Sequence, residues 1–502
     1  MTDRLSVMRG SLNRLHFEEA AAQLGELEKQ SLTAEETFEL QLLKARLARG
    51  LYRNQEALAA AEKAQALAES PKQQERALLE AARGLHGTGK SHQGLEMLEK
   101  HLLHHPQARP DLLFYWLFLL AENGRVQEAQ ESVPELNRRL ETERFENSMA
   151  EVEWLSFQGD LASYLEKPQE AVHYYQLARA KVDAFIPENW RPLRQAILYQ
   201  NLADTREQEE AFSLALEAYE TARTYLKEQE KRDPELSDLS GYWLELLLSL
   251  ANMYAFSDAY EKADQVLEEA RERLESRPPR QKDYYTSRWL FYSGLNDLYK
   301  GDADSREAAR KKLKQAWAMQ SELVARGKDK KEHLGKTAYY LQSLLPDAPE
   351  YRKEQHELTL QAMEIFEELK EKDPAFYLSG LAGLWNDLGR LESEPAKALL
   401  AYEQSASAYQ AYLQRYPADS FARQSLCIAW MNTLEPLRRS GQDKRLQARE
   451  KELEALLGQL AEENPEFVLS ILPSLRAEPL AEGFLEELEG LEEQLEAQLL
   501  AA

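Results

Sequence analysis

The chain has 502 residues, a formal net charge of −25, 43% hydrophobic residues and 30% charged residues. A surface this acidic repels nucleic acid and anionic membranes, so neither is expected as a partner. The chain is rich in good helix formers and has no run of alternating β-branched residues, which predicts an all-α protein. The single cysteine, Cys427, excludes a disulfide within the chain, and no apolar run has signal-peptide or membrane-spanning length. We therefore expect a cytoplasmic protein.

Prolines recur where helical stretches end, separated by 35 to 48 residues or by about twice that distance. This spacing predicts pairs of helices, with two pair boundaries that lack a proline, near 141–145 and 327–331. The recurring prolines are Pro71, Pro106, Pro187, Pro234, Pro278, Pro374, Pro417 and Pro465.

Taken in chain order, the pairs fall into three predicted regions. Residues 1–145 have repeats of about 35 residues, with turns at Gly50–Asn54, Gly87–Ser91 and Asn123–Gly124. Residues 146–464 have repeats of about 45 residues, which implies longer helices. Residues 465–502 form an acidic tail. We count about eleven pairs before this tail.

One stretch, 384–417, carries the clearest signature. A tryptophan is followed by Leu-Gly, a small residue, an aromatic four residues later and a closing proline: Trp385, Leu388, Gly389, Ala398, Tyr402 and Pro417. This order resembles the tetratricopeptide repeat, a helix–turn–helix unit found in bacterial helical repeat proteins. The resemblance implies an α-solenoid whose first helices line the inner groove of a superhelix.

The end of the acidic tail has the pattern of a capping helix. Phe484, Leu488, Leu491 and Leu495 form one apolar stripe between 480 and 499, and glutamates occupy the other faces. Terminal repeats need a polar outer face, so we expect this helix to close the solenoid.

Two motifs suggest ligand chemistry that their context does not support. Gly84–Ser91 satisfies the phosphate-loop pattern, but the preceding residues have a helical pattern instead of a buried strand. Five histidines lie between His86 and His105, with His101 and His105 one helical turn apart, but no third metal ligand accompanies them. No serine, cysteine or histidine set suggests catalysis. We expect no metal, no cofactor and no enzymatic activity.

Asparagines recur on the predicted first helices, at Asn13, Asn252, Asn296, Asn386 and Asn432. The resemblance implies that they face the groove, where a side-chain amide can pair with the backbone of a bound peptide. Hydrogen bonding between helices is the alternative. The lysine and arginine clamp that some of these repeats use for acidic C-terminal peptides is not evident.

Residues 271–340 form the one net-basic region, with 17 Lys and Arg against 10 Asp and Glu. Lys311, Lys312 and Lys314 lie together on one predicted helix. They are candidates for steering an acidic partner, and a solvated helix face is the alternative.

These features predict a non-enzymatic scaffold or adaptor that binds a protein or peptide along its groove. The alternatives are a regulator that responds to a small peptide and a regulatory partner of a separately encoded enzyme. The oligomeric state stays open at this point.

Overall fold

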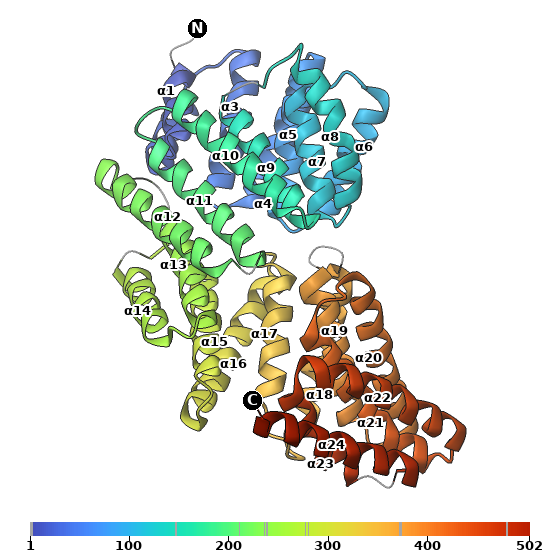
Figure 1. The fold of residues 1–502 in the computed structure, drawn as a ribbon. Coiled ribbons are helices and arrows are strands. Elements are labelled where there is room, and N and C mark those ends of the chain that lie inside the picture. Colours follow the sequence, from blue (N-terminus) through green and yellow to red (C-terminus); the bar gives the residue numbers. More distant parts are fainter. Residues whose placement is uncertain are drawn as a thin grey trace. The chain divides into compact units, whose positions relative to one another are not determined.

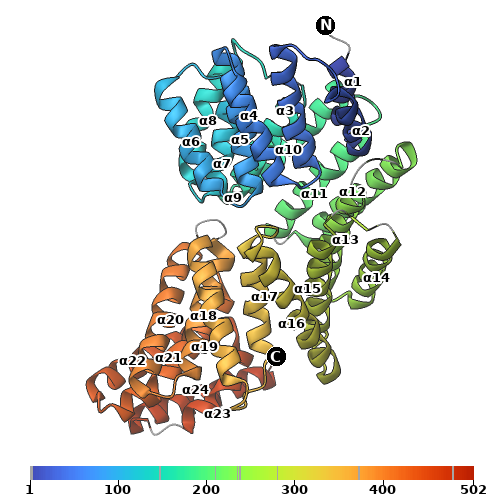
Figure 2. The same cartoon turned by 180° about the vertical axis from the view of Figure 1, so that it is seen from behind.

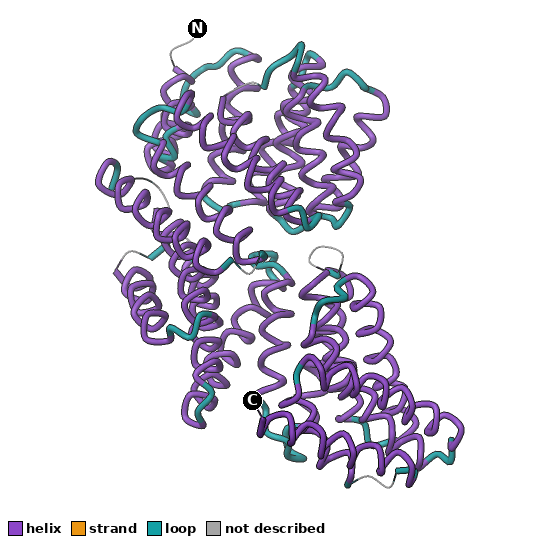
Figure 3. The backbone as a smooth tube through the Cα atoms, viewed as in Figure 1, coloured by secondary structure: helices purple, strands orange, loops and turns teal. Residues whose placement is uncertain are grey.

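The computed structural model describes residues 4–145, 148–209, 211–234, 236, 239–276, 278–279, 281–370, 374–477 and 480–501. These residues form 24 helices and no strand (Figures 1 and 3). Consecutive helices pack as helix–turn–helix pairs, from α1 with α2 to α23 with α24. The prediction of an all-α, tetratricopeptide-like solenoid is confirmed. The eleven predicted pairs are followed by a twelfth, because the tail itself forms two helices.

The chain divides into two compact units, residues 1–330 and 331–502. The division concerns packing, whereas the boundary predicted at residue 145 concerns repeat length and stays a prediction. The helices of the first unit are α1 (Arg4–Asn13), α2 (Phe17–Leu27), α3 (Ala34–Gly50), α4 (Asn54–Leu67), α5 (Pro71–Gly87), α6 (Ser91–His104), α7 (Pro110–Glu122), α8 (Val126–Leu140), α9 (Ser148–Tyr164), α10 (Pro168–Phe185), α11 (Arg191–Gln208), α12 (Phe212–Arg232), α13 (Leu239–Phe256), α14 (Tyr260–Ser276), α15 (Lys282–Lys300) and α16 (Ala303–Ala325). Those of the second unit are α17 (Lys331–Leu344), α18 (Arg352–Leu369), α19 (Pro374–Leu391), α20 (Pro395–Arg415), α21 (Ser420–Arg439), α22 (Asp443–Glu463), α23 (Pro465–Arg476) and α24 (Glu482–Ala501).

The stretch with the clearest repeat signature forms the pair α19 and α20. A Cβ added at Gly389 would lie 2.5 Å from the ring of Tyr402, so only glycine allows the second helix to approach this closely. Leu388 and Ala398 are buried between the two helices. The repeat signature of this stretch therefore reflects how the two helices pack against each other.

Proline and capping residues set the helix starts. Pro71, Pro374 and Pro465 are the first residues of α5, α19 and α23, where the missing N–H would have no helical partner. Thr33 and Ser70 each form a capping box with the residue three positions later, which satisfies the exposed N–H groups of α3 and α5. The prolines therefore mark the junctions between pairs, and several of them begin the next helix.

The last pair covers the end of the second unit. Phe484, Leu488 and Leu495 of α24 are buried in a core shared with α21, α22 and α23, and Leu491 packs against that core. The predicted capping helix is confirmed. None of the described helices combines the length and the apolar character needed to cross a membrane.

Candidate functional site

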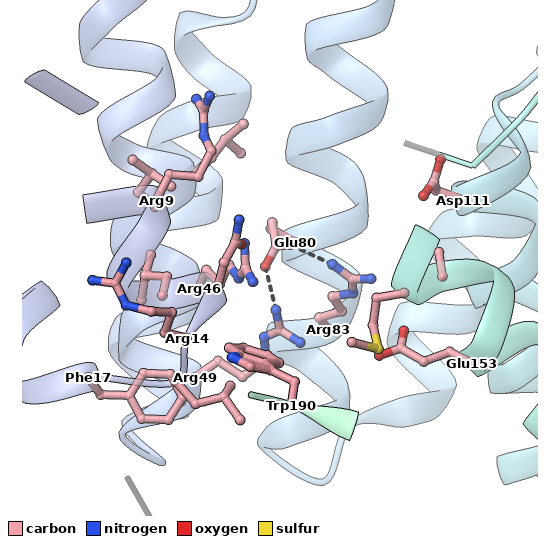
Figure 4. A pocket seen from close by; sticks show the side chains of 18 of the residues that line it. Arg9, Arg14, Phe17, Arg46, Arg49, Glu80, Arg83, Asp111, Glu153 and Trp190 are labelled. Carbon is pink, nitrogen blue, oxygen red and sulfur yellow. Dashed lines mark hydrogen bonds and ion pairs between the residues drawn. The ribbon is translucent and has the colours of Figure 1, made fainter. Parts of the chain in front are cut away.

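The first unit contains a cavity of about 1170 Å³ (Figure 4). Its lining residues come from α1, α3, α5, α7, α9, α11 and α13, which are the first helices of seven successive pairs, and from the turns that follow α1, α3 and α10. One residue of a second helix, Phe17 at the start of α2, completes the lining. The cavity is thus the inner groove of the first unit, and its volume lies slightly above the usual range of small-molecule pockets.

The two ends of the groove come together where the first pair meets the sixth and seventh pairs (Figures 1 and 2). Leu15, in the turn between α1 and α2, packs against the core built by α11 to α14. The adjacent His16 has its Nε2 atom 2.9 Å from a carboxylate oxygen of Asp233, at the end of α12. The contact of Leu15 and the hydrogen bond between His16 and Asp233, which lie more than 200 residues apart in sequence, therefore join the two ends of the groove.

The charge of the cavity is opposite to that of the whole chain. Seven arginines and four carboxylates line it, an excess of three positive charges in a protein of net charge −25. The arginines are Arg9, Arg14, Arg46, Arg49, Arg76, Arg83 and Arg194, and the carboxylates are Glu39, Glu80, Asp111 and Glu153.

Three of the arginines occupy one position of the repeat. Arg9, Arg46 and Arg83 are each separated by 37 residues, and each lies eight residues before the first residue of the second helix of its pair. Because α1, α3 and α5 are neighbours, these side chains form a row across three successive first helices. We call Arg9, Arg46 and Arg83 the arginine row.

One carboxylate lies at the centre of the arginine-rich wall. Glu80 accepts a hydrogen bond of 2.7 Å from Arg83 and one of 3.3 Å from Arg49 (Figure 4). Burial alone would raise the pKa of Glu80, but the charges of Arg49, Arg83 and Arg46 hold it below its ordinary value. Glu80 is therefore ionised at neutral pH and offsets part of the local positive charge.

Two arginines of the cavity have no such partner. Among the described side chains, neither Arg46 nor Arg194 has a hydrogen-bond or ion-pair partner, and the buried Nε of Arg194 is unsatisfied. Burial lowers the pKa of Arg46, and the like charges of Arg49 and Arg83 lower it further, in opposition to Glu80. Guanidinium groups are planar donors that suit carboxylate and phosphate oxygens, so this wall can bind an anion.

The groove also offers apolar contact area. Phe17, Tyr52, Trp190 and Tyr242 line the cavity, and Tyr52 is exposed. Aromatic rings give binding sites large contact areas at low conformational cost. The cavity can therefore hold a ligand that is partly anionic and partly apolar, such as a peptide.

Further along the groove the same repeat position carries acids. Asp160 of α9 and Asp204 of α11 also lie eight residues before the second helix of their pairs. Asp160 accepts a hydrogen bond of 2.6 Å from Tyr175, and Asp204 accepts one from Tyr219. Desolvation of the carboxyl group by the surrounding protein raises the pKa of each aspartate to about 6, and the hydrogen bond from its tyrosine opposes this effect.

The predicted asparagines lie on first helices, but their side-chain amides form hydrogen bonds with other side chains of the same chain. Asn296 is buried on α15 and donates to Asp264 at 2.7 Å, and Asn252 of α13 donates to Glu207 at 3.4 Å. Asn432 of α21 donates to Asn386 of α19 at 2.9 Å. The four candidates thus lie in two separate units and outside the cavity, and their role in partner binding stays a prediction. Asn13, at the end of α1, does line the cavity.

The predicted lysines lie on α16, a second helix that does not line the cavity. Lys311 is exposed and pairs with Glu307 at 3.5 Å. Lys312 is half-buried and pairs with Asp297 at 2.7 Å, and Lys314 is exposed. Arg277 and Arg280 of the same basic region lie outside the described residues. A steering role for the lysines likewise stays a prediction.

The phosphate-loop pattern forms a turn between two helices. Gly84 and Gly87 belong to the end of α5, Gly89 adopts a left-handed φ of 75°, and Ser91 begins α6. The rings of His101 and His105 stack at 4.5 Å. No group of three or more His, Cys, Asp or Glu side chains within the described ranges is arranged to hold a metal ion.

The sequence contains a signal for the arginine row that is separate from the predicted asparagines and lysines. The spacing of 37 residues is visible when the first three second helices, which start at Phe17, Asn54 and Ser91, are aligned. Only this alignment shows that three arginines share a position. That the row faces a closed cavity depends on the meeting of residues 15–16 with α11 to α14, which no local pattern predicts.

Comparison with known proteins gives a likeness of fold. No protein-family model matches the chain, and no curated protein does. Solved structures that resemble it include a Rap protein complexed with competence and sporulation factor, at 12% identity and a TM-score of 0.47, over 78% of this chain and 98% of that one. NprR in complex with its cognate peptide NprX matches at 13% identity and a TM-score of 0.38, over 68% and 96%. A tetratricopeptide repeat protein from Parabacteroides merdae matches at 17% identity and a TM-score of 0.36, over 60% and 98%. At these identities and scores the likeness concerns helical repeats alone.

Proposed function

We propose that this protein is a binding scaffold that holds a peptide or a segment of another protein in the cavity of its first unit. The observation that carries the proposal is the cavity itself, which seven successive first helices line and whose two ends the contact of His16 with Asp233 joins. An elongated groove formed by many repeats suits an elongated ligand, because each repeat can contact a different part of it.

The lining supports a peptide over a small metabolite. Charged, amide and aromatic side chains are spread over the whole groove and do not converge on one point. A volume of about 1170 Å³ exceeds the usual range of roughly 300–1,000 Å³ for small-molecule pockets. Carboxylates and arginines in the same wall can recognise both the backbone and the side chains of a peptide.

An unbiased peptide selection tests this function. A random peptide library would be selected against the protein and against two variants with a filled cavity, Asn13→Trp and Asn189→Trp, both at exposed lining positions. Gln93→Trp, at an exposed position of α6 away from the cavity, is the matched control. We expect enriched peptides that bind the protein and Gln93→Trp equally and bind the filled variants weakly. Peptides that bind all four proteins equally, or no enrichment, would contradict the proposal.

A further inference from the structure

We propose that the cavity is specific for an extended acidic segment whose carboxylate side chains recur at every third residue, each held by one member of the arginine row. This inference rests on the proposed function and adds the chemistry and the spacing of the ligand. It follows from the charge of the cavity, from its unpaired arginines and from the recurrence of the row on three neighbouring first helices.

The first observation is the reversal of charge. The chain is strongly acidic, yet the cavity has an excess of three positive charges. Clustered arginines repel one another, and in this wall one carboxylate, Glu80, is shared by Arg49 and Arg83. An anionic ligand would relieve this repulsion, because opposite charges attract strongly in a partly desolvated cavity.

The second observation is that two arginines of the cavity are unused, whereas Arg9 and Arg83 pair with Glu39 and Glu80 and would exchange or share these partners with a ligand. Arg46 lies in the middle of the row, and Arg194 lies on α11, which is also part of the lining. Neither has a partner among the described residues, and the Nε of Arg194 is buried. A buried polar donor without a partner destabilises the free protein, and a bound carboxylate would offset that cost.

The third observation concerns spacing. The helices α1, α3 and α5 are neighbours, and packed helices lie about 8–10 Å apart, so we expect equivalent residues on them to recur at about this interval. A polyproline II segment has three residues per turn and rises about 3.1 Å per residue, so side chains three residues apart lie on the same side about 9 Å apart. A β-strand would place residues three apart on opposite sides. The row therefore fits acidic residues at positions i, i+3 and i+6 of a polyproline II segment.

A peptide is favoured over a nucleic acid by the carboxylates in the same wall. Glu39, Glu80, Asp111 and Glu153 would face a continuous phosphate backbone. An acidic peptide can place neutral residues opposite them, because only every third residue needs a charge. Phe17, Tyr52 and Trp190 provide contact area for those neutral residues.

Fluorescence anisotropy with labelled synthetic peptides tests the proposal. One peptide repeats Glu-Pro-Ala, a second replaces each glutamate with glutamine, and a third has the same composition with its glutamates adjacent. A phosphoserine peptide of the same spacing and a single-stranded oligothymidine complete the set. We expect the spaced glutamate peptide to bind at least about tenfold more tightly than the glutamine peptide, the equivalent of one charge-assisted contact or more. The adjacent-glutamate peptide should bind more weakly than the spaced one.

Equal binding of the glutamate and glutamine peptides would overturn the acidic specificity, and equal binding of the spaced and adjacent peptides would overturn the spacing. Tighter binding of oligothymidine than of any peptide would overturn the assignment to a peptide. Binding of the phosphoserine peptide without binding of the glutamate peptide would show that the cavity is specific for phosphate and not for carboxylate. That result would contradict the inference.

Variants place the binding at the row. Arg46→Gln should weaken the spaced peptide about tenfold, and Arg46→Lys, which keeps the charge and loses the planar fork, should have a smaller effect. Lys44→Gln removes the same charge from the same helix, at a residue that pairs with Glu28 away from the cavity, and should leave the affinity within about twofold. Circular dichroism and thermal melting confirm that each variant is folded. An effect of Lys44→Gln as large as that of Arg46→Gln would indicate general electrostatics and would overturn the site.

The outcomes separate this inference from the proposed function. If the random library yields neutral peptides that need the open cavity, the scaffold function stands and the acidic specificity fails. If neither the library nor the designed peptides bind in a manner that depends on the cavity, both fail.

Discussion

Within the first unit, the arginine row on α1, α3 and α5 and the aspartates on α9 and α11 occupy the same position of the repeat. Each residue lies eight residues before the second helix of its pair. Asp160 and Asp204 receive hydrogen bonds from Tyr175 and Tyr219, which lie on the second helices of the same pairs. Arg46 has no hydrogen-bond or ion-pair partner among the described side chains. Arg9 forms a partly exposed ion pair with Glu39.

The difference shows how a repeat position can serve structure in one region and remain available for binding in another. A charged group that already receives a hydrogen bond within its own pair offers little to a ligand. A charged group left without a partner costs stability in the free protein and gains it when a ligand binds. The comparison therefore predicts opposite responses when carboxylates in the two regions are neutralised.

The largest expected effect is that of Glu80→Gln. This change leaves Arg49 and Arg83 without their shared carboxylate, and we expect a loss of about 2 kcal/mol in the free energy of unfolding at about pH 7. The folded-state pKa of Glu80 lies below its ordinary value of 4.5, so its stabilisation is present above that value and lost as the pH falls through the folded pKa. Thermal melts of both proteins from about pH 7 to about pH 3 should therefore converge at low pH.

Glu153→Gln is the matched control, because Glu153 lines the same cavity from α9 but is exposed. It should change the stability by less than about 0.5 kcal/mol. A gap between wild type and Glu80→Gln that stays constant with pH would contradict the role assigned to the ionised carboxylate.

A smaller effect of opposite sign is expected for Asp160→Asn. The pKa of Asp160 is raised from 3.8 to about 6, mainly by burial, so the folded state holds a proton that the unfolded state releases. The carboxyl therefore destabilises the fold increasingly as the pH rises from about 4 to about 6, and the penalty is constant above that range. A shift of two units would correspond to about 3 kcal/mol at full burial, and partial exposure reduces it to about 1 kcal/mol.

The variant should thus be more stable than wild type at about pH 7 and equal to it near pH 4. The asparagine oxygen still accepts the hydrogen bond from Tyr175, so the packing is preserved. Tyr175→Phe serves as the control, since it removes the donor and should destabilise the pair. A loss of stability of Asp160→Asn at neutral pH would show that neutralising a carboxylate destabilises both regions, and it would contradict the predicted opposite responses.

The smallest expected effect is that of His16→Ala, which tests the closure of the groove. The His16 side chain is partly exposed and pairs with Asp233, so its loss should cost about 0.5–1 kcal/mol. The exposed His173 of α10 provides the control, and His173→Ala should leave the melting temperature unchanged within about one degree. An identical melting temperature for His16→Ala and wild type would show that the contact of Leu15 alone closes the groove.

The fold could be predicted from the sequence because each helix pair carries its own local signals. Gly389 faces Tyr402, capping residues begin α3 and α5, and prolines mark junctions along the whole chain. These features involve residues of one pair or of neighbouring pairs, so they are visible in the sequence alone.

The site could be predicted only in general terms. That first helices would line a groove followed from the resemblance, and Asn13 was placed among the candidates that face it. The other asparagines failed to reveal the cavity because an amide on a first helix can bond to the next pair, as Asn296 does with Asp264. The basic region at 271–340 is visible from its net charge, whereas the arginines of the cavity are spread from residue 9 to residue 194 and do not form one basic segment.

Hydrogen exchange measured by mass spectrometry, with and without the spaced glutamate peptide, tests the central claim most directly. The account predicts added protection in α1, α3 and α5 and in the lining segment 186–190, with none in α16 or in the second unit. The same peptide should protect nothing in Arg46→Gln at concentrations that protect the wild type. Protection confined to α16, or protection that survives in Arg46→Gln, would contradict the claim that the arginine-lined cavity is the binding site.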